Sequence, residues 1–238
     1  MLEIDRLSVR FDGIEALRDL TLSVPQGARV GVLGPNGSGK TTLYNAISGL
    51  IAIASGTIRL DGKTISHRAP HEIAAAGVAR TFQTVRAFDR LSVFDNAVPA
   101  TGPAAARPSA AREAAAAALE TVGLGPRRDA LAGDLSFYER RRLEIARAIA
   151  QHPRLVLADE PTAGLSLAES EHVIGLLSRA FDAATTILLI EHRIDAVEAL
   201  CPRALLLAEG RLVADTATSD MRRDPQLASV YFGSYLTP

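Results

Sequence analysis

Apolar and polar residues alternate over residues 2–11 and again over residues 17–24. This period-two pattern is typical of strands with one buried and one solvent-facing side. Asp12-Gly13 separates the two runs and favours a tight turn. Residues 28–33 are mostly apolar and predict a short buried strand. The N-terminal part of the chain is therefore expected to be β-rich, with an antiparallel edge.

The pattern becomes helical after residue 40. Residues 41–50 (TTLYNAISGL) carry apolar side chains at helical spacing, and Gly49 is a stop signal. Residues 57–60, before Asp61-Gly62, predict one strand of a hairpin. Residues 110–124 (AAREAAAAALETVGL) favour a helix because alanine has the highest helix propensity. The Pro- and Ala-rich stretch before them predicts a loop, and the pattern leaves open whether residues 99–112 are ordered.

Strand and helix signals alternate from residue 143 onward. The expected order is helix, strand, helix, strand, helix and strand, with the apolar runs LVLADEP, TTILLIEH and RALLLAEGRLVAD as the strands. Short apolar strands interleaved with helices predict a mainly parallel sheet covered on both faces. The fold class is therefore α/β.

Composition narrows the function classes. The chain of 238 residues has 26 Lys+Arg against 27 Asp+Glu, a net charge of −1, which lacks the basic footprint of a nucleic-acid binder. Its hydrophobic (47%) and charged (22%) fractions suit a globular protein. A single cysteine, Cys201, excludes an internal disulfide and is expected to be buried. Apolar runs stay well below the ~18 residues of a membrane span, and the charged first residues predict no secretory leader.

A phosphate-binding loop follows the apolar run 28–33. The motif G-x-x-x-x-G-K-[ST] is satisfied by Gly34, Pro35, Asn36, Gly37, Ser38, Gly39, Lys40 and Thr41. Glycines let consecutive backbone N–H groups converge on phosphate oxygens, and the helix that follows directs its dipole at the same anion. Lys40 would reach the β- and γ-phosphates, and the Thr41 hydroxyl would coordinate Mg²⁺. The spacing predicts an ATP site.

Two acids end a later apolar strand. Asp159 closes the run LVLAD, which places it at the carboxyl edge of the expected sheet, where it can hold Mg²⁺. Glu160 follows and can orient or deprotonate an attacking water. The pattern predicts hydrolysis of the γ-phosphate.

With these motifs, the whole chain resembles the nucleotide-binding subunit of ATP-binding-cassette (ABC) transporters. The resemblance implies a RecA-like P-loop core in residues 1–83 and 151–238, with a helical subdomain in residues 84–150. It implies that Phe11 stacks on adenine, that Thr42 joins the phosphate contacts, and that Gln83 (in ARTFQ) contacts Mg²⁺. It also implies that His192 (in LLIEH) contacts the γ-phosphate. For Phe11 an ordinary core role stays open.

Within that family the chain is most similar to ATPase subunits of branched-chain amino-acid importers, through stretches such as GVARTFQTVRAFDRLSVFDNAV, ADEPTAGL and SVYFG. This implies a second ATPase subunit, transmembrane permease subunits and, indirectly, a solute-binding protein as partners. It also implies a peripheral location on the cytoplasmic face of the membrane. Two alternatives stay open: a soluble non-transport ABC ATPase, and a subunit that binds ATP but hydrolyses it weakly.

The chain departs from the family at its signature motif. Leu-Ser-Gly-Gly-Gln is replaced by LSFYE, so Tyr138 stands where a glycine normally approaches the ATP bound to the opposite subunit, although Ser136 keeps its expected contact in trans. A positive φ at Tyr138 would cost ~1–2 kcal/mol. Ser166 replaces the Asp of the neighbouring segment. These departures favour an asymmetric heterodimer over a homodimer.

The same residues have a simpler local interpretation. Ser136-x-x-Glu139 ahead of an apolar periodic run is a capping box that opens a helix. The arginines at 140–142 are expected to form a solvated face, with an interface role as the alternative.

Overall fold

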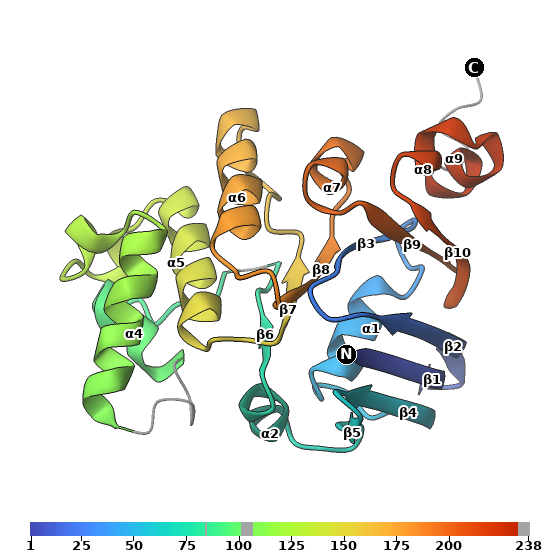
Figure 1. Cartoon of the computed structure of the whole chain (residues 1–238), viewed down its shortest axis with the longest axis horizontal. Helices are drawn as coiled ribbons and strands as arrows, with labels where there is room; N and C mark the ends of the chain where they lie inside the picture. Colours follow the sequence, from blue (N-terminus) through green and yellow to red (C-terminus); the bar gives the residue numbers. More distant parts are fainter. Residues whose placement is uncertain (84, 101–106, 233–238) are drawn as a thin grey trace. The chain divides into compact units, whose positions relative to one another are not determined.

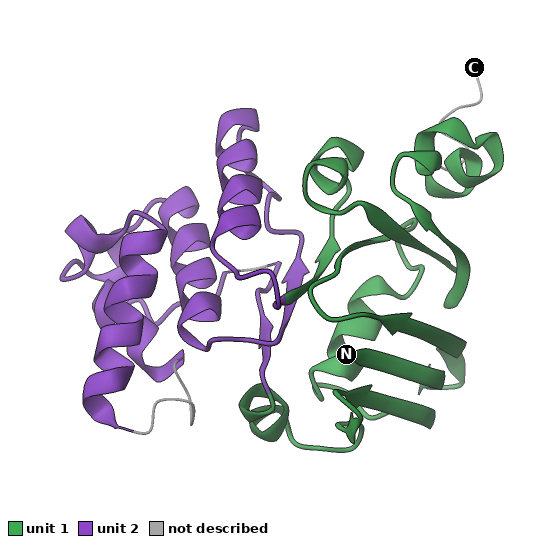
Figure 2. Cartoon of the chain, in the orientation of Figure 1, with its two compact units in different colours: residues 1–76, 186–238 green, residues 77–185 purple. Residues whose placement is uncertain are grey.

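The computed structural model describes residues 1–83, 85–100 and 107–232. The chain forms two compact units, one of residues 1–76 with 186–238 and one of residues 77–185 (Figure 2). The expected boundaries after residues 83 and 150 stay a prediction. Part of the loop expected within residues 99–112 falls on 101–106, outside the described residues.

The first unit contains a four-stranded antiparallel sheet in the order β2-β1-β4-β5 (Figure 1). Its strands are β1 (Leu2–Phe11), β2 (Ile14–Val24), β4 (Ser55–Leu60) and β5 (Lys63–Thr64). The β2 strand begins three residues earlier than its alternation predicts, because Asp12 and Gly13, with φ of 45° and 86°, form a two-residue turn that pairs Phe11 directly with Ile14. The predicted antiparallel edge is therefore present.

The same unit holds a group of strands in the order β10-β9-β3-β8. The β3 strand (Arg29–Leu33) runs parallel to β8 (Thr186–Ile190) and β9 (Arg203–Ala208), and β10 (Arg211–Ala217) is antiparallel to β9. All but one residue of β3 and every residue of β8 are buried, as expected of parallel strands covered on both faces. The helices of this unit are α1 (Lys40–Ile47), α2 (Pro70–Ala75), α7 (Ile194–Leu200), α8 (Asp220–Arg223) and α9 (Pro225–Phe232).

The second unit combines two parallel strands with helices. The strands are β6 (Val78–Arg80) and β7 (Leu155–Asp159). The helices are α3 (Val93–Ala97), α4 (Pro108–Thr121), α5 (Phe137–Ala150) and α6 (Leu167–Arg179), with 3₁₀ turns η2 (Gly125–Arg127) and η3 (Ala132–Asp134). The alanine-rich α4 packs beside α5 (Figure 1). Its buried side is made of small residues, Ala115 and Ala118, together with Leu119.

Two expectations from composition can be compared with the fold. Cys201 is fully buried at the end of α7, and burial raises the pKa of its thiol to about 12, so it stays a neutral apolar group. Within the described part of the chain, no helix combines the length and apolar character needed to cross a bilayer.

Candidate functional site

The phosphate loop (residues 34–41) connects β3 to α1, as its sequence context predicts. Its three glycines all have positive φ: 146° at Gly34, 79° at Gly37 and 104° at Gly39, which is the N-cap of α1. A Cβ added to Gly34 would lie 2.1 Å from the backbone oxygen of Leu207 in β9. Only glycine fits at that point, because the loop backbone passes directly against the strand.

The polar groups of this loop suit a polyphosphate. The Ser38 hydroxyl is buried and has no hydrogen-bond partner among the described residues, which is an unusual condition for a buried polar atom. The Lys40 ammonium donates to the backbone oxygens of Gly34 (2.7 Å) and Pro35 (3.0 Å), so it lies back over the loop. Thr41 is exposed and Thr42 half-buried in the first turn of α1. A donor hydroxyl, a cation and a helix N-terminus are thus brought together where an anion would bind.

Phe11 and His192 also belong to the first unit. Phe11 closes β1 and is 46% exposed, so the alternative that it is a core residue is wrong. His192 follows β8 and is exposed, and its backbone oxygen accepts a 2.7 Å hydrogen bond from the Tyr231 hydroxyl of α9. Burial, followed by the nearby Glu191 carboxylate, raises the pKa of Tyr231 to about 12, so its hydroxyl remains a donor. The C-terminal helix thereby fixes the backbone that carries His192.

The second unit brings Gln83, Asp159 and Glu160 together. The Gln83 amide Nε2 donates to Glu160 Oε2 at 2.9 Å. Glu160 has φ of 47°, a conformation that costs a side-chain-bearing residue of order 1 kcal/mol. Asp159 is buried at the end of β7, with its carboxylate 2.9 Å from the Arg80 guanidinium.

Arg80 is a site residue that the sequence analysis missed. It ends β6, one strand along from Asp159, and its side chain is only 7% exposed. A signal was available, because Arg80 lies three residues before Gln83 and at the carboxyl end of its own strand. Its contact with Asp159 follows only from the pairing of β6 with β7, which aligns Arg80 with Leu157.

The altered signature motif opens α5 with the predicted capping box. The Ser136 hydroxyl accepts from the Glu139 backbone N–H at 3.2 Å, and the Glu139 carboxylate accepts from the Ser136 N–H at 2.9 Å. Ser166 caps α6 in the same way with Glu169, a second capping box that the sequence analysis did not identify. Both serines therefore have a structural role within the chain.

Tyr138 lies in the first turn of α5, where the backbone is right-handed helical, so the cost of a positive φ does not arise. Its half-buried side chain is directed at α6, where its hydroxyl is hydrogen-bonded to Nδ1 of His172. The Arg142 guanidinium lies 4.6 Å from the centre of its ring. The ring that replaces the family glycine is thus packed within its own unit.

The expectation of a solvated arginine face at 140–142 is wrong for Arg141. Its side chain is fully buried and lies 2.8 Å from the Glu144 carboxylate, also buried. Arg140 and Arg142 are half-buried. The helical spacing of α5 turns Arg141 to the same side as Glu144, three residues on, which places both in the interior of the unit.

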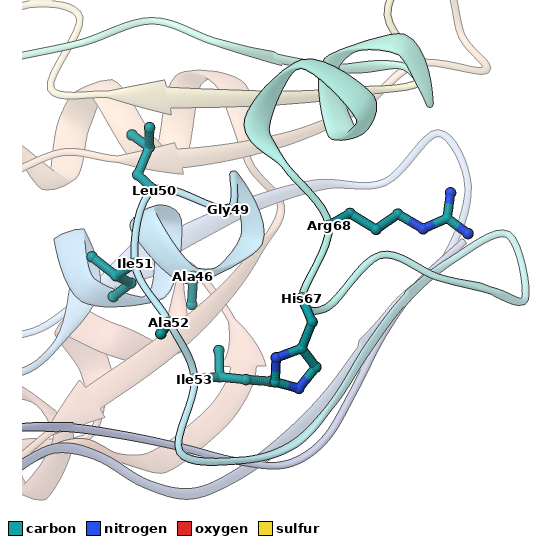
Figure 3. Close-up of a pocket in the computed structure, with 8 residues that line it drawn as sticks. All are labelled: Ala46, Gly49, Leu50, Ile51, Ala52, Ile53, His67 and Arg68. Carbon is teal, nitrogen blue, oxygen red and sulfur yellow. The ribbon is translucent and has the colours of Figure 1, made fainter.

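A pocket of about 320 Å³ lies at the carboxyl end of α1 (Figure 3), away from the phosphate loop that precedes its amino end. The residues that line it are Ala46, Gly49, Leu50, Ile51, Ala52, Ile53, His67 and Arg68. Its walls are mostly aliphatic, and none of the predicted nucleotide-binding residues contributes to it. The pocket is separate from the nucleotide site.

Comparisons with known proteins agree with this geometry. The ABC transporter family profile matches residues 17–163. The high-affinity branched-chain amino acid transport ATP-binding protein BraF of Pseudomonas aeruginosa is 34% identical over 98% of both chains. The lipopolysaccharide export ATP-binding protein LptB of Escherichia coli is 32% identical over 95% of both.

Solved structures give the same result. A crystal structure of an ABC transporter cassette in its ADP conformation matches this chain with a TM-score of 0.87 and 27% identity, covering 98% of each chain. A nucleotide-free cassette also gives 0.87 and 27%, covering 98% of this chain and 99% of its own. The RecA-like cassette fold is thereby confirmed. The chain belongs to the ABC transporter family, as an ATP-hydrolysing subunit whose activity is coupled to transmembrane transport.

Proposed function

We propose that this chain binds ATP with Mg²⁺ through its phosphate loop and that Asp159 and Glu160 serve the hydrolysis of ATP. The observation that carries the proposal is the loop itself. Its backbone leaves no room for a side chain at Gly34, it leaves the Ser38 hydroxyl buried without a partner, and it gathers Lys40 beside them. These features suit a bound triphosphate tail.

The residues have distinct roles in this proposal. Phe11 stacks on adenine, and its exposed ring at the end of β1 supports that role. Bound Mg²⁺ would be held by Thr41, Gln83 and Asp159, whose hydroxyl, amide and carboxylate oxygens are of the kind this cation prefers. Glu160 orients and deprotonates water, His192 contacts the γ-phosphate, and Ser136 binds the ATP of the opposite subunit.

The contacts of the second unit support the roles of Gln83 and Glu160. Here the Gln83 amide group donates to the Glu160 carboxylate, so one proposed metal ligand and the proposed base lie in direct contact. Bound Mg²⁺ would supply a positive charge that draws the Gln83 oxygen and neutralises the transferred phosphoryl group. Catalysis then rests on positioning and charge stabilisation rather than on covalent chemistry.

The transported solute is proposed from similarity. Branched-chain amino acids or similar small polar solutes, taken up by import, are favoured because BraF and the LivG protein of Escherichia coli, 33% identical, are both named for that transport. The chain would then lie on the cytoplasmic face of the membrane, bound to permease subunits that receive solute from a binding protein. LptB is nearly as similar, so lipopolysaccharide export is the second candidate.

A second ATPase subunit completes the proposal, and a heterodimer is favoured because Tyr138 and Ser166 depart from the family pattern. Both departures are accommodated locally, through His172 and the Glu169 cap, so they change the surface offered to a partner without straining this chain. Native mass measurement of the complex purified from its own membranes tests this point. Two copies of this chain and no other ATPase would refute the heterodimer. The transported solute is tested separately, by comparing the uptake of labelled leucine with that of a panel of small polar solutes.

Glu160→Gln tests the ATPase assignment. The substitution keeps the shape and removes the base, so ATP binding measured by calorimetry should stay within about threefold while turnover falls by at least ~100-fold. Glu169→Gln is a matched control, because it changes a carboxylate that caps α6 and lies outside the proposed site. Retained turnover in Glu160→Gln would show that Glu160 is not the base. Lys40→Ala is expected to lose ATP binding, because it removes the cation of the phosphate loop.

A further inference from the structure

The Arg141–Glu144 pair is the most deeply buried ionic group in the described residues. The Arg141 side chain is 0% exposed and that of Glu144 is 4% exposed, with 2.8 Å between Nη1 and Oε2. Removing two charges from water is costly unless further hydrogen bonds satisfy them. The partners in those further hydrogen bonds therefore indicate the role of the pair.

The pair bonds to the backbone of one short segment. Arg141 Nη1 donates to the Phe82 oxygen at 2.7 Å, and Nη2 donates to the Gln83 oxygen at 2.9 Å. In the opposite sense, the Phe82 N–H donates to Glu144 Oε1 at 2.7 Å. Three backbone groups of two consecutive residues are thus held by two side chains of α5.

A third α5 side chain bonds to the same stretch of chain. The Arg147 guanidinium donates to the backbone oxygen of Arg86. The guanidinium groups of Arg80 and Arg86 lie 5.0 and 4.8 Å from the centre of the Phe82 ring. Side chains of α5 therefore hold the backbone at Phe82 and Gln83 and again at Arg86.

The consequence of this attachment lies at the Gln83 side chain. Its amide donates to Glu160 at 2.9 Å, so the chain of contacts runs from the interior of α5 through the Gln83 backbone to the proposed base. The same helix is capped at its N-terminus by Ser136, which lies in the altered signature motif. A single helix, α5, thus connects the signature segment to the backbone of Gln83.

We propose that Arg141 and Glu144 are positioning residues, which act on ATP hydrolysis by holding the Phe82–Gln83 backbone so that the Gln83 side chain meets Glu160. The inference rests on the proposed roles of Gln83 and Glu160. It goes beyond them because it assigns a function in turnover to two buried residues that are not among the proposed nucleotide-binding residues. A guanidinium fork and a carboxylate are needed because each residue must bond to its partner and to the backbone at once.

The test is a double-mutant cycle on the full-length chain, with Mg-ATP turnover as the readout. Arg141→Lys keeps the charge and loses the two-pronged contact with the Phe82 and Gln83 oxygens. It is expected to lower kcat about tenfold with KM changed less than about twofold, because small displacements of catalytic groups reduce the rate more than binding. Arg140→Lys is the matched control, since Arg140 bonds to Asp89, Gly133 and Leu135 and should change kcat less than about twofold.

Gln83→Ala separates positioning from a structural role. If Arg141 acts through the Gln83 side chain, the double variant Arg141→Lys, Gln83→Ala should turn over at the rate of Gln83→Ala alone, within about twofold. Independent effects would multiply, and that result would overturn the proposal. An unchanged kcat in Arg141→Lys would overturn it as well.

A different result is expected if the proposed role of Gln83 is itself wrong. If Gln83→Ala alone leaves kcat unchanged, the role of Gln83 is refuted, and the inference falls with it for that reason. Circular dichroism and nucleotide affinity report whether Arg141→Lys is folded. Should it not fold, Glu144→Gln replaces it in the same cycle, because the amide oxygen can still accept from the Phe82 N–H while the charge that pairs with Arg141 is removed.

Discussion

Alanine at two glycines of the phosphate loop isolates the effect of close packing. Gly34 and Gly37 both have positive φ, so alanine is disfavoured by the backbone at either position. The two differ in their surroundings: a Cβ on Gly34 would lie 2.1 Å from the Leu207 backbone oxygen, whereas a Cβ on Gly37 would meet nothing within 4 Å. Gly37→Ala is thus the matched control for Gly34→Ala.

The magnitudes follow from these two environments. At Gly37 the positive φ costs alanine ~1–2 kcal/mol, offset by ~0.4–1 kcal/mol because alanine has less freedom than glycine in the unfolded chain. The expected net loss is about 1 kcal/mol. At Gly34 the overlap with a backbone atom that cannot rotate away adds ~1–3 kcal/mol, as in an overpacked core. The total expected for Gly34→Ala is therefore about 3 kcal/mol.

The assay is urea unfolding followed by circular dichroism, with both variants measured beside the parent chain. An unchanged slope with a lower midpoint indicates a loss of native-state stability. The expected difference between the two variants is about 2 kcal/mol. Equal losses at the two positions would show that the contact between Gly34 and Leu207 does not govern the choice of residue, which would refute the reasoning.

Two further predictions follow from single side chains. Phe11→Ala should change the free energy of unfolding by less than about 1 kcal/mol, because the ring is nearly half exposed. If the ring stacks on adenine, the same substitution should weaken ATP binding at least ~10-fold. An unchanged affinity in calorimetry would exclude stacking. Burial, together with two neighbouring guanidinium groups, lowers the pKa of His172, so protonation favours the unfolded chain. The stability due to neutral His172 is then complete above its unfolded pKa of about 6.5 and is lost as the pH falls below it, towards the lower folded pKa. His172→Gln should therefore show a flatter dependence of melting temperature on pH between about 7 and 5, and parallel curves for the two proteins would contradict this.

Much of the architecture could be predicted from the sequence because its signals are local. The run before residue 34 and the helix after residue 40 identify the phosphate loop, since a strand, a glycine-rich turn and a helix are each encoded by neighbouring residues. The same holds for Ser136 and Glu139, three residues apart, whose capping box forms as predicted. Local spacing also indicated the antiparallel edge and the α/β class.

The tertiary structure decided how side chains distant in sequence meet. Arg141 reads as part of a charged surface run, yet it is buried, because α5 packs against a segment some sixty residues earlier whose backbone oxygens it satisfies. Arg80 acquires Asp159 as a partner only when β6 pairs with β7. The Tyr138 hydroxyl has a hydrogen-bond partner only because the fold places His172 of α6 beside it. A charged or bulky residue has no fixed place of its own: its position depends on whether the folded chain supplies partners that offset the loss of water.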